Sequence, residues 1–285
     1  MKKILITGVN SYVGNSLADW LGKEPENYSI DKISMRDGTW KERDFSVYDV
    51  VVHVAGIAHV STDPKMEEQY YKINRDLTIE VAEKSKNEGV KQFIFLSSII
   101  VYGENIANNG IIDKDTIPRP SNFYGNSKLE AEKGIEHLND MNFHIVTIRP
   151  PMIYGKGSKG NYPKLAKAAQ KLPIFPNINN QRSMIHIDNL SEFIKLLINK
   201  EERGLFFPQN REYVKTSEMV KIISEVHGKK VILVKLFNPL LHLMRHRMGI
   251  VNKVFGDLVY DRELSEYKVD YCNKNLYQSI VATER

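Results

Sequence analysis

Cysteine is almost absent from this sequence, and long apolar runs are missing altogether. The single cysteine, Cys272, excludes an internal disulfide and is typical of a reducing compartment. No apolar stretch approaches the roughly 20 residues that a membrane-spanning helix needs, and the apolar run Ile4–Ile6 is too short for the core of a signal peptide. These absences predict a cytoplasmic protein without an integral membrane segment.

The sequence also shows no evident block of like charge. Lys and Arg number 40 and Asp and Glu number 35, which gives a net charge of +5. This mild excess suits a small anionic ligand, whereas proteins that bind nucleic acid gather their basic residues in runs. We therefore expect no nucleic-acid partner. With 285 residues, of which 42% are hydrophobic, the chain can bury the core of one large α/β domain or of two lobes.

The amino-terminal segment has the order of a dinucleotide-binding motif. Residues 2–7 read as a buried strand, residues 8–14 as a glycine-containing turn, and apolar residues then recur every four positions over residues 13–21, as in an amphipathic helix. The free amides and the positive dipole at the start of such a helix suit a pyrophosphate. Ser11 replaces the middle glycine of the usual motif and adds a hydroxyl donor. We rank an ordinary strand–helix turn below this interpretation.

The end of the second predicted strand, residues 28–35, bears on the choice of cofactor. In dinucleotide-binding domains an acidic residue about 20 positions past the glycines binds the ribose of NAD, and an arginine there suits the phosphate of NADP. Ser34 and Arg36 favour NADP, although Asp37 is near enough to allow NAD. An equally weighted alternative is that Arg36 is an ordinary solvated loop residue.

Two further buried strands end in small or hydroxyl-bearing residues. Residues 49–54 lead into Ala55-Gly56, and small side chains at the carboxyl end of a parallel strand leave space for a cofactor. His53, inside this strand, is expected to pack rather than to react. Residues 92–96 lead into Ser97 and Ser98, where a serine could donate a hydrogen bond to a substrate oxygen or could simply end the strand.

Tyr124 and Lys128 stand four positions apart at the start of a predicted helix, so their side chains share one face. A nearby ammonium favours the phenolate and lowers the pKa of a tyrosine, which would let the phenol transfer protons at neutral pH. Taken alone, the pair is more simply a surface tyrosine and a solvated lysine, because this spacing is common in helices. The surrounding motifs have to decide between the two.

The regular alternation of strand and helix loosens near residue 151. We predict a Rossmann-type, doubly wound parallel sheet over residues 1–150, to which residues 183–200 return. Residues 151–182 and 201–285 are predicted to form a smaller, interleaved lobe that binds the substrate. Within the returning segment, Asp188 is expected to cap a helix and to be structural rather than catalytic.

Residues 238–254 combine leucines with basic side chains. Such a helix could touch a membrane surface or a partner. We favour a helix packed on the second lobe, because apolar helix faces usually belong to the core.

Six motifs occur in the order and at the spacing of the extended short-chain dehydrogenase/reductases, and more narrowly of the nucleotide-sugar epimerase/dehydratase group. They are Thr7-Gly8 with Gly14, Asp49–Gly56, Phe95–Ser98 with Val101–Gly103, Tyr124 with Lys128, Arg149-Pro150 and Ile185–Asp188. Each motif alone is weak evidence for this resemblance, but the six occur in order and together cover about residues 1–200. The resemblance implies an NAD(P)-dependent enzyme with no metal, a UDP-linked or other nucleotide-diphosphate sugar as substrate, and a homodimer.

The resemblance also implies roles for single residues. Tyr124 would be the catalytic acid/base, Lys128 would lower its pKa and bind the nicotinamide ribose, and Ser98 would complete the catalytic set. The residues expected to contact the cofactor are Gly8, Asn10, Ser11, Tyr12, Val13, Gly14, Arg36, Asp44, Ala55, Gly56, Asn74, Tyr124 and Lys128. The residues expected to contact the substrate are Ser98, Asn161 and Arg182, the last two at its diphosphate.

The residues after Ser98 narrow the predicted reaction. The dehydratases of this group carry an acidic pair there, whereas Ile99 and Ile100 cannot transfer protons, which argues against dehydration. We favour an NADPH-dependent reductase of a 4-keto sugar in bacterial surface-polysaccharide precursor synthesis, because of Arg36 and because residues 252–261 are similar to reductases of UDP-4-keto-6-deoxy-N-acetylhexosamines. The alternatives are a 4-epimerase with retained NAD and, in a different class, a non-catalytic dinucleotide sensor.

Overall fold

The computed structural model describes residues 1–57, 63–103, 110–245 and 249–285. The chain divides into two compact units, which we describe separately. Unit 1 consists of Met1–Gly103, Ile117–Pro150 and Leu190–Pro208, and unit 2 of Glu104–Thr116, Pro151–Asn189 and Gln209–Arg285. Each unit is therefore assembled from three separate stretches of sequence.

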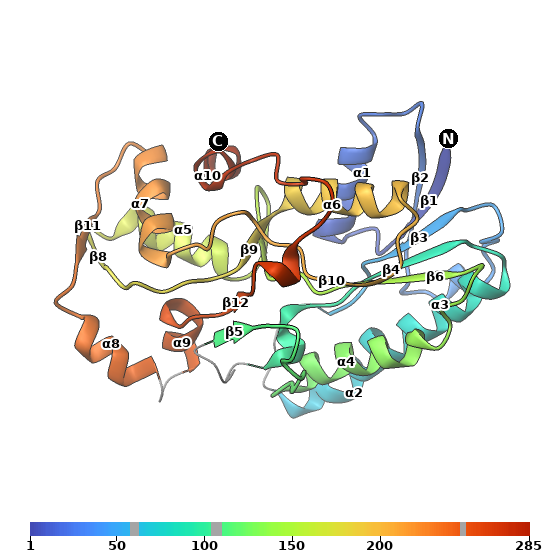
Figure 1. Cartoon of the computed structure of the whole chain (residues 1–285), viewed down its shortest axis with the longest axis horizontal. Coiled ribbons are helices and arrows are strands. Elements are labelled where there is room, and N and C mark those ends of the chain that lie inside the picture. Colours follow the sequence, from blue (N-terminus) through green and yellow to red (C-terminus); the bar gives the residue numbers. More distant parts are fainter. Residues whose placement is uncertain (58–62, 104–109, 246–248) are drawn as a thin grey trace. The chain divides into compact units, whose positions relative to one another are not determined.

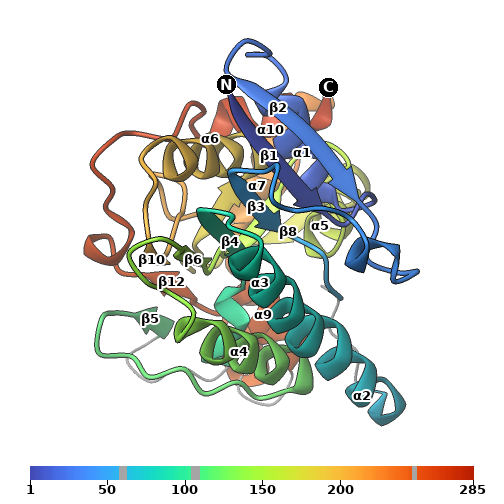
Figure 2. The ribbon, with the colours of Figure 1, turned by 90° about the vertical axis from the view of Figure 1, so that its right-hand side faces the viewer.

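A six-stranded parallel sheet forms the centre of unit 1 (Figure 2), in the order β10-β6-β4-β3-β1-β2. The strands are β1 (Lys2–Thr7), β2 (Tyr28–Ile33), β3 (Val50–His53), β4 (Gln92–Leu96), β6 (His144–Ile148) and β10 (Gly204–Phe206). The chain first adds β2 on one side of β1 and then crosses to add β3 on the other. The carboxyl ends of β1 and β3 thus form a switch point, where doubly wound sheets bind ligands. The predicted Rossmann-type sheet is confirmed.

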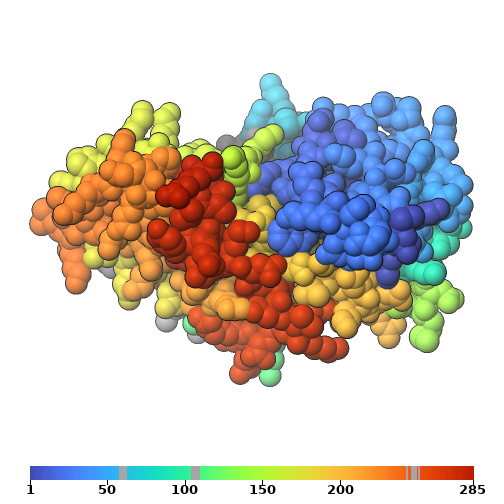
Figure 3. Space-filling model, turned by 90° about the horizontal axis from the view of Figure 1, so that it is seen from above, coloured from blue at the N-terminus to red at the C-terminus, as the bar shows by residue number. Residues whose placement is uncertain are grey.

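Helices cover both faces of this sheet. Figure 1 shows α1 (Tyr12–Leu21) and α6 (Ile187–Asn199) on one face, with α3 (Leu77–Asn87) and α4 (Phe123–Glu136) on the other. Figure 2 shows α3 and α4 side by side. Figure 3 shows atoms of α6, in amber, beside the blue atoms of the amino-terminal elements. There the Trp20 indole donates a hydrogen bond to Glu192, with a nitrogen–oxygen distance of 2.8 Å.

The core of unit 1 follows from the alternation of side chains along its strands. Leu5, Val51, Phe93 and Ile145 are neighbours in register across four strands, and all four are buried on one face of the sheet. They belong to one apolar cluster with residues of α3 and α4. Burying a side chain of this size contributes about 1.5–3 kcal/mol, so this layer fixes where the strand ends lie.

The segment from Asp63 to α3 is not one continuous helix. Asp63 caps its start, since the Asp63 carboxylate accepts a hydrogen bond from the Lys65 amide at 3.0 Å. The chain then passes through a 3₁₀ turn, the short helix α2 (Glu67–Tyr70) and a π-helical stretch (Tyr71–Asp76) before α3 begins. Such π-helical turns are rare and often mark functional sites. Here the stretch carries the predicted site residue Asn74.

Unit 2 contains only short strands, in three separate pairs. Parallel pairing joins β5 to β12, β7 to β9 and β8 to β11. These strands are β5 (Ile111–Ile112), β7 (Met152–Tyr154), β8 (Ile174–Pro176), β9 (Met184–His186), β11 (Ile232–Val234) and β12 (Val259–Tyr260). The helices are α5 (Asn161–Lys171), α7 (Thr216–Val226), α8 (Asn238–Arg245), α9 (Gly249–Phe255) and α10 (Leu276–Glu284). Buried apolar residues of α5, α7 and α10 share one core, and Phe255 of α9 packs against it.

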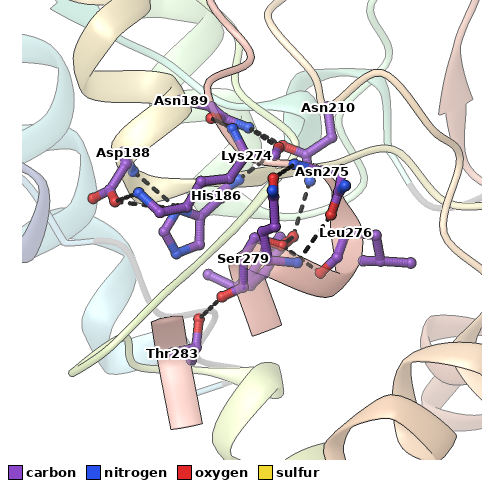
Figure 4. Close-up of polar contacts among 11 residues, drawn as sticks. His186, Asp188, Asn189, Asn210, Lys274, Asn275, Leu276, Ser279 and Thr283 are labelled. Carbon is purple, nitrogen blue, oxygen red and sulfur yellow. Dashed lines mark hydrogen bonds and ion pairs between the residues drawn. The ribbon is translucent and has the colours of Figure 1, made fainter. Parts of the chain in front are cut away.

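A polar cluster holds the carboxy-terminal segment of unit 2 against the start of α6 (Figure 4). Lys274 forms an ion pair with Asp188, and the Asn189 amide donates to the Lys274 carbonyl at 3.2 Å and to Asn210 Oδ1 at 2.9 Å. The prediction that Asp188 caps the helix is wrong, because α6 begins one residue earlier, at Ile187. Asp188 lies in the first turn and pairs with a residue 86 positions away, so the structure uses it to join two segments.

The basic, apolar segment 238–254 contains two helices, α8 and α9. Residues 246–248 between them lie outside the described residues. The two helices contact each other within unit 2 (Figure 1).

Candidate active site

The turn after β1 passes close to the end of β3, and glycine makes this approach possible. Gly8 has a φ of +84°, in the left-handed region that favours glycine, and a Cβ atom there would lie 3.1 Å from the Cα of Ala55. A Cβ atom on Gly14 would lie 2.9 Å from the Val54 side chain. The two glycines therefore bring the start of α1 against the ends of β1 and β3, which is the packing that a dinucleotide site requires.

Ser11, at the place of the usual middle glycine, is the N-cap of α1. Its Oγ accepts a hydrogen bond from the Gly14 amide at 3.2 Å. The cap satisfies one free amide of the first turn and leaves the hydroxyl hydrogen able to donate. Of the other predicted cofactor residues here, Asn10 is exposed, Tyr12 and Val13 form the first turn of α1, and Val13 is buried.

Asn74 joins the loop after β3 to α4. Its Oδ1 accepts from the Ile57 amide at 2.8 Å, and its Nδ2 donates to the Ile57 carbonyl and to Ser127 Oγ, each at 3.2 Å. A Cβ atom on Gly56 would lie 2.9 Å from Asn74 Oδ1 and 3.4 Å from Lys128 Nζ. The structure thus brings three predicted site residues, Gly56, Asn74 and Lys128, to one place at the carboxyl edge of the sheet.

Ser98 and Tyr124 meet beside this loop. Ser98 follows β4 and caps the 3₁₀ turn Ile99–Tyr102, where its Oγ accepts from the Ile100 amide at 3.3 Å. The buried phenol of Tyr124, on the first turn of α4, is hydrogen-bonded to the Ser98 side chain. Burial raises the pKa of Tyr124 to about 12, although the Ser98 hydrogen bond opposes this shift. The phenol is therefore protonated at neutral pH.

Lys128 lies one turn after Tyr124 on α4 and is almost fully buried. Its ammonium donates to the Leu96 carbonyl at 2.9 Å and lies 4.6 Å from the centre of the Phe95 ring. Burial lowers the pKa of Lys128 to about 8, while the carboxylate of Glu132 raises it. The sequence predicts a lowered pKa for Tyr124, whereas the structure gives a raised one, because burial of the phenol is the largest effect on it.

A buried ion pair that the sequence analysis did not identify lies one turn further along α4. Glu132 accepts from the Arg149 guanidinium at 2.6 Å, and the Ser97 hydroxyl donates to the same carboxylate. Arg149 also donates to the Tyr102 hydroxyl at 2.8 Å. The four-residue spacing from Tyr124 through Lys128 to Glu132 places Glu132 on the same face of α4, but it does not point to Arg149. The pair ties α4 to the ends of β4 and β6.

His53 is fully buried and serves the fold, as predicted. Thr78 Oγ1 donates to the Asn74 carbonyl at 2.7 Å, so it accepts from His53 Nε2, which lies 3.1 Å away. On the other side Thr7 Oγ1 accepts from the Ala55 amide and lies 3.0 Å from His53 Nδ1, to which it donates. Burial lowers the pKa of His53 to about 3, so the neutral ring links β1, β3 and α3.

The loop after β2 presents an arginine and two acidic residues. Asp37 accepts from Thr39 Oγ1 at 2.7 Å, and Asp44 accepts from Ser46 Oγ at 2.6 Å. These hydrogen bonds lower the pKa of both carboxyls. Arg36 is exposed, and within the part of the chain that the structure describes its guanidinium makes no hydrogen bond or ion pair. Both carboxylates are thus held by local turns, while the guanidinium faces solvent.

The two predicted diphosphate contacts lie in unit 2. Arg182 forms backbone bridges with Val214 and Leu258, and its side chain donates to the Gly256 carbonyl at 3.1 Å. Burial lowers the pKa of Arg182 to about 10, which leaves it charged at neutral pH. Asn161 is exposed at the start of α5.

The described part of the chain offers neither a metal site nor a membrane span. Among the residues that the structure describes, no three His, Cys, Asp or Glu side chains are grouped so as to hold a metal ion. Over the same residues, no helix combines the length and the apolar character needed to cross a membrane.

Comparison with known proteins identifies the family of this chain. The model of the NAD-dependent epimerase/dehydratase family matches residues 4–207. The chain belongs to this family. The resemblance inferred from the six motifs is thereby confirmed, and so is the prediction of an NAD(P)-dependent enzyme.

Relatives within the NAD-dependent epimerase/dehydratase family differ in activity. The chain is 33% identical to UDP-glucose 4-epimerase of Vibrio cholerae over 77% of its own length and 74% of that protein. It is 28% identical to N-acetyl-alpha-D-glucosaminyl-diphospho-ditrans,octacis-undecaprenol 4-epimerase of Escherichia coli O157:H7, over 89% and 81% of the two chains. The solved structure of dTDP-4-dehydrorhamnose reductase from Bacillus anthracis in complex with NADP has a TM-score of 0.68 at 23% identity, over 83% and 85% of the two chains. This last likeness shows the fold alone.

The residues at the switch point fit the dinucleotide that the NAD-dependent epimerase/dehydratase family uses. The left-handed Gly8 and the capped start of α1 leave backbone amides open to a pyrophosphate. Gly56 leaves the space beside Lys128 free of a side chain. A nicotinamide dinucleotide is therefore the supported cofactor class of the protein.

Proposed function

We propose that this protein acts at C4 of a nucleotide-diphosphate sugar, and that it reduces a 4-keto sugar with NADPH. The observation that carries the proposal is the grouping of Ser98, Tyr124 and Lys128 next to Gly56 at the carboxyl edge of the parallel sheet. When bound, the dinucleotide would supply the hydride. The following roles belong to the protein.

The protonated phenol suits reduction better than oxidation. Reducing a ketone requires a proton for its oxygen, and a tyrosine whose pKa is raised to about 12 is protonated at neutral pH. In the proposed reaction the Tyr124 hydroxyl gives its proton to the C4 oxygen, and the Ser98 hydroxyl orients the same oxygen. The charge of Lys128 stabilises the phenolate that remains.

The loop after β2 favours NADPH. Asp37 and Asp44 are engaged with Thr39 and Ser46, whereas the Arg36 guanidinium is exposed beyond the end of β2. A guanidinium pairs well with a phosphate, and an arginine in this place suits the 2′-phosphate of NADP. The predicted contact of Asp44 with the adenine stays a prediction.

We further propose that unit 2 binds the nucleotide-diphosphate end of the substrate. Arg182 is charged, partly buried and fixed by backbone pairing on both sides, so it can offer a positive charge to a diphosphate. Asn161 would add an amide donor. A UDP-linked sugar and a homodimer in the cytoplasm are part of the same proposal.

The second candidate function is a 4-epimerase with tightly retained NAD. The two relatives named as 4-epimerases favour it. Dehydration remains disfavoured, because Ile99 and Ile100 follow Ser98 in the 3₁₀ turn and carry no titratable group.

The experiment that separates the two functions starts with the cofactor. The purified protein is denatured, any released dinucleotide is identified, and the emptied protein is titrated with NADPH and NADH. We expect little retained dinucleotide and a preference for NADPH that Arg36→Ser reduces by about tenfold or more, with NADH affinity unchanged as the internal control. Stoichiometric retained NAD would instead support the epimerase. Turnover of 4-keto or UDP-linked sugars then identifies the substrate, and turnover of any of them excludes a non-catalytic sensor.

A further inference from the structure

Unit 2 exposes an apolar surface on α8 and on the turn before it. The residues are Leu236, Phe237, Leu240 and Leu243, which are 82%, 44%, 56% and 60% exposed. We call these four residues the α8 surface. Leu240 and Leu243, three positions apart in α8, share one face of the helix, and Leu236 and Phe237 belong to the turn before it. Gathered apolar side chains of this size mark interaction sites on water-soluble proteins.

The α8 surface lies in a segment that has basic but no acidic residues. Between Glu225 and Asp257 there is no acidic residue, and there are six basic ones: Lys229, Lys230, Lys235, Arg245, Arg247 and Lys253. The net charge of the whole chain is +5, so the rest of the chain has a net charge of 5 − 6 = −1. The segment thus carries a local charge of +6, although residues 141–187, with seven basic and no acidic residues, are at least as basic.

α8 is attached to unit 2 through its other side. The Asn238 side chain donates to the Asn177 carbonyl at 2.9 Å, and α8 contacts α9, whose Val251 is buried. Leu241, on this inner side, is only partly exposed. The segment is thus anchored to the core of unit 2 while the α8 surface faces solvent.

We propose that the α8 surface binds the face of an anionic lipid bilayer. Leucine and phenylalanine side chains of an interfacial helix enter the boundary between headgroups and acyl chains, while lysine and arginine are attracted to the negative headgroups. Lys230 and Lys235, which are exposed on either side of β11 in the chain segment before α8, provide that charge. The sequence analysis favoured a helix whose apolar face is packed in the core, and the exposed fractions of the leucines contradict it.

Charge argues against a second copy of the chain on this surface. A twofold interface brings the same patch of both copies together, so two segments of +6 would face each other. An anionic surface has the complementary sign, and a lipid bilayer also accepts the leucines. The proposal is independent of the reaction catalysed at the edge of unit 1.

The test measures binding of the full chain to large vesicles by co-sedimentation. Vesicles of phosphatidylcholine with about a third phosphatidylglycerol are compared with pure phosphatidylcholine. We expect binding to the anionic vesicles that is at least about tenfold stronger and that weakens at high salt. The triple variant Leu236→Ser, Leu240→Ser, Leu243→Ser should lose at least about tenfold in binding, and Lys230→Glu with Lys235→Glu should do the same.

The matched control replaces exposed apolar residues of unit 1, Ile117→Ser with Met141→Ser, and should bind vesicles like the original chain. Thermal unfolding and turnover of a water-soluble substrate should be the same for the triple variant, which shows that it folds. Equal binding to neutral vesicles, or undiminished binding by the triple variant, would overturn the proposal. A homodimer in sedimentation analysis that the triple variant abolishes would also overturn it, because the α8 surface would then be a protein interface.

Discussion

The two units bury polar side chains of different kinds. In unit 1 Lys128, Glu132 and Arg149 are all less than a tenth exposed, so ionised groups lie inside the fold. In unit 2 the buried polar residues are mainly amides and hydroxyls, among them Asn180, Asn189, Gln209 and Asn210. Unit 1 thus buries ionised groups close to the candidate active site, whereas the buried polar side chains of unit 2 mainly form hydrogen bonds within that unit.

The amides of unit 2 compensate for its short strands. Three strand pairs of two or three residues satisfy few backbone groups, and buried backbone groups need partners. Asn180 supplies several of these, since it accepts from the Thr216 amide at 3.0 Å and donates to the Val254 carbonyl at 3.3 Å. In unit 1 the six-stranded sheet satisfies its own backbone, so polar side chains at the strand ends are available for a site.

The sharpest test of this contrast uses two buried tyrosines. Burial raises the pKa of both Tyr124 in unit 1 and Tyr154 in unit 2 to about 12, and each is hydrogen-bonded to a serine. Tyr124→Phe should reduce turnover by about a thousandfold, because a general acid contributes about 10²–10⁴, while cofactor affinity stays the same. Tyr154→Phe is the control and should change turnover less than about tenfold. Steady-state kinetics and cofactor titration are carried out on both variants. A fully active Tyr124→Phe variant would show that Tyr124 is not the general acid.

The next test removes one partner of the ion pair in unit 1. Arg149→Met leaves the Glu132 carboxylate buried without its guanidinium, which should lower the free energy of unfolding by about 3–5 kcal/mol. The double variant Arg149→Met with Glu132→Gln should recover most of that loss, because no buried charge is then unpaired. Urea denaturation gives the values. If the double variant were as unstable as the single one, packing rather than charge would explain the loss.

A smaller loss is expected when an amide of unit 2 is removed. Asn180→Ala leaves the Thr216 amide without its acceptor, which should cost about 1–3 kcal/mol. Cofactor affinity should not change, since Asn180 belongs to unit 2. An exposed amide, Asn142→Ala, serves as the control in the same denaturation series. A loss as large as that of Arg149→Met would contradict the distinction between ionised and neutral buried groups.

The smallest effect concerns the buried histidines, one in each unit. Burial lowers the pKa of His53 to about 3 and that of His186 to about 4. Below pH 6.5 the unfolded chain therefore binds more protons than the folded chain. The contribution of these histidines to the free energy of unfolding is fully present above pH 6.5 and is lost as the pH falls. Each histidine should add about 1.4 kcal/mol per pH unit to the slope between pH 6 and about pH 4.5.

Urea denaturation at several pH values measures this slope. His186→Gln should remove one histidine's share of it, and His137→Gln, at an exposed position, should not. An unchanged slope in the His186→Gln variant would mean that His186 is protonated in the folded chain.

Sequence patterns predicted the parts of the fold that depend on local order. The run of apolar residues in β1 and the four-residue repeat in α1 are local signals, and the structure places both as predicted. Ser98 and Tyr124 were grouped through the family resemblance, and the structure brings their side chains together. The Glu132–Arg149 pair was missed because its partners are 17 positions apart on a helix and a strand, and no spacing rule links them.

Other features depend on burial, which spacing does not reveal. The direction of the Tyr124 pKa shift follows from burial of the phenol rather than from its distance to Lys128 along the helix. The pairing of β5 with β12 joins residues almost 150 positions apart through two-residue strands, too short for a periodic signal. The exposure of the α8 surface could not be predicted from the sequence either, because an amphipathic pattern does not show whether another part of the protein covers the apolar face.

The interleaving of the two units has a consequence for protein synthesis. The last strand of the large sheet, β10, ends at Phe206 and pairs with β6. β6 ends at Ile148, so at about 5–20 residues per second a ribosome needs roughly 3–12 seconds after β6 has been made before β10 is complete. During that interval β6 is an open sheet edge, of the kind that recruits other chains. Chaperone demand during translation should therefore peak between residues 150 and 206, well before the chain is complete.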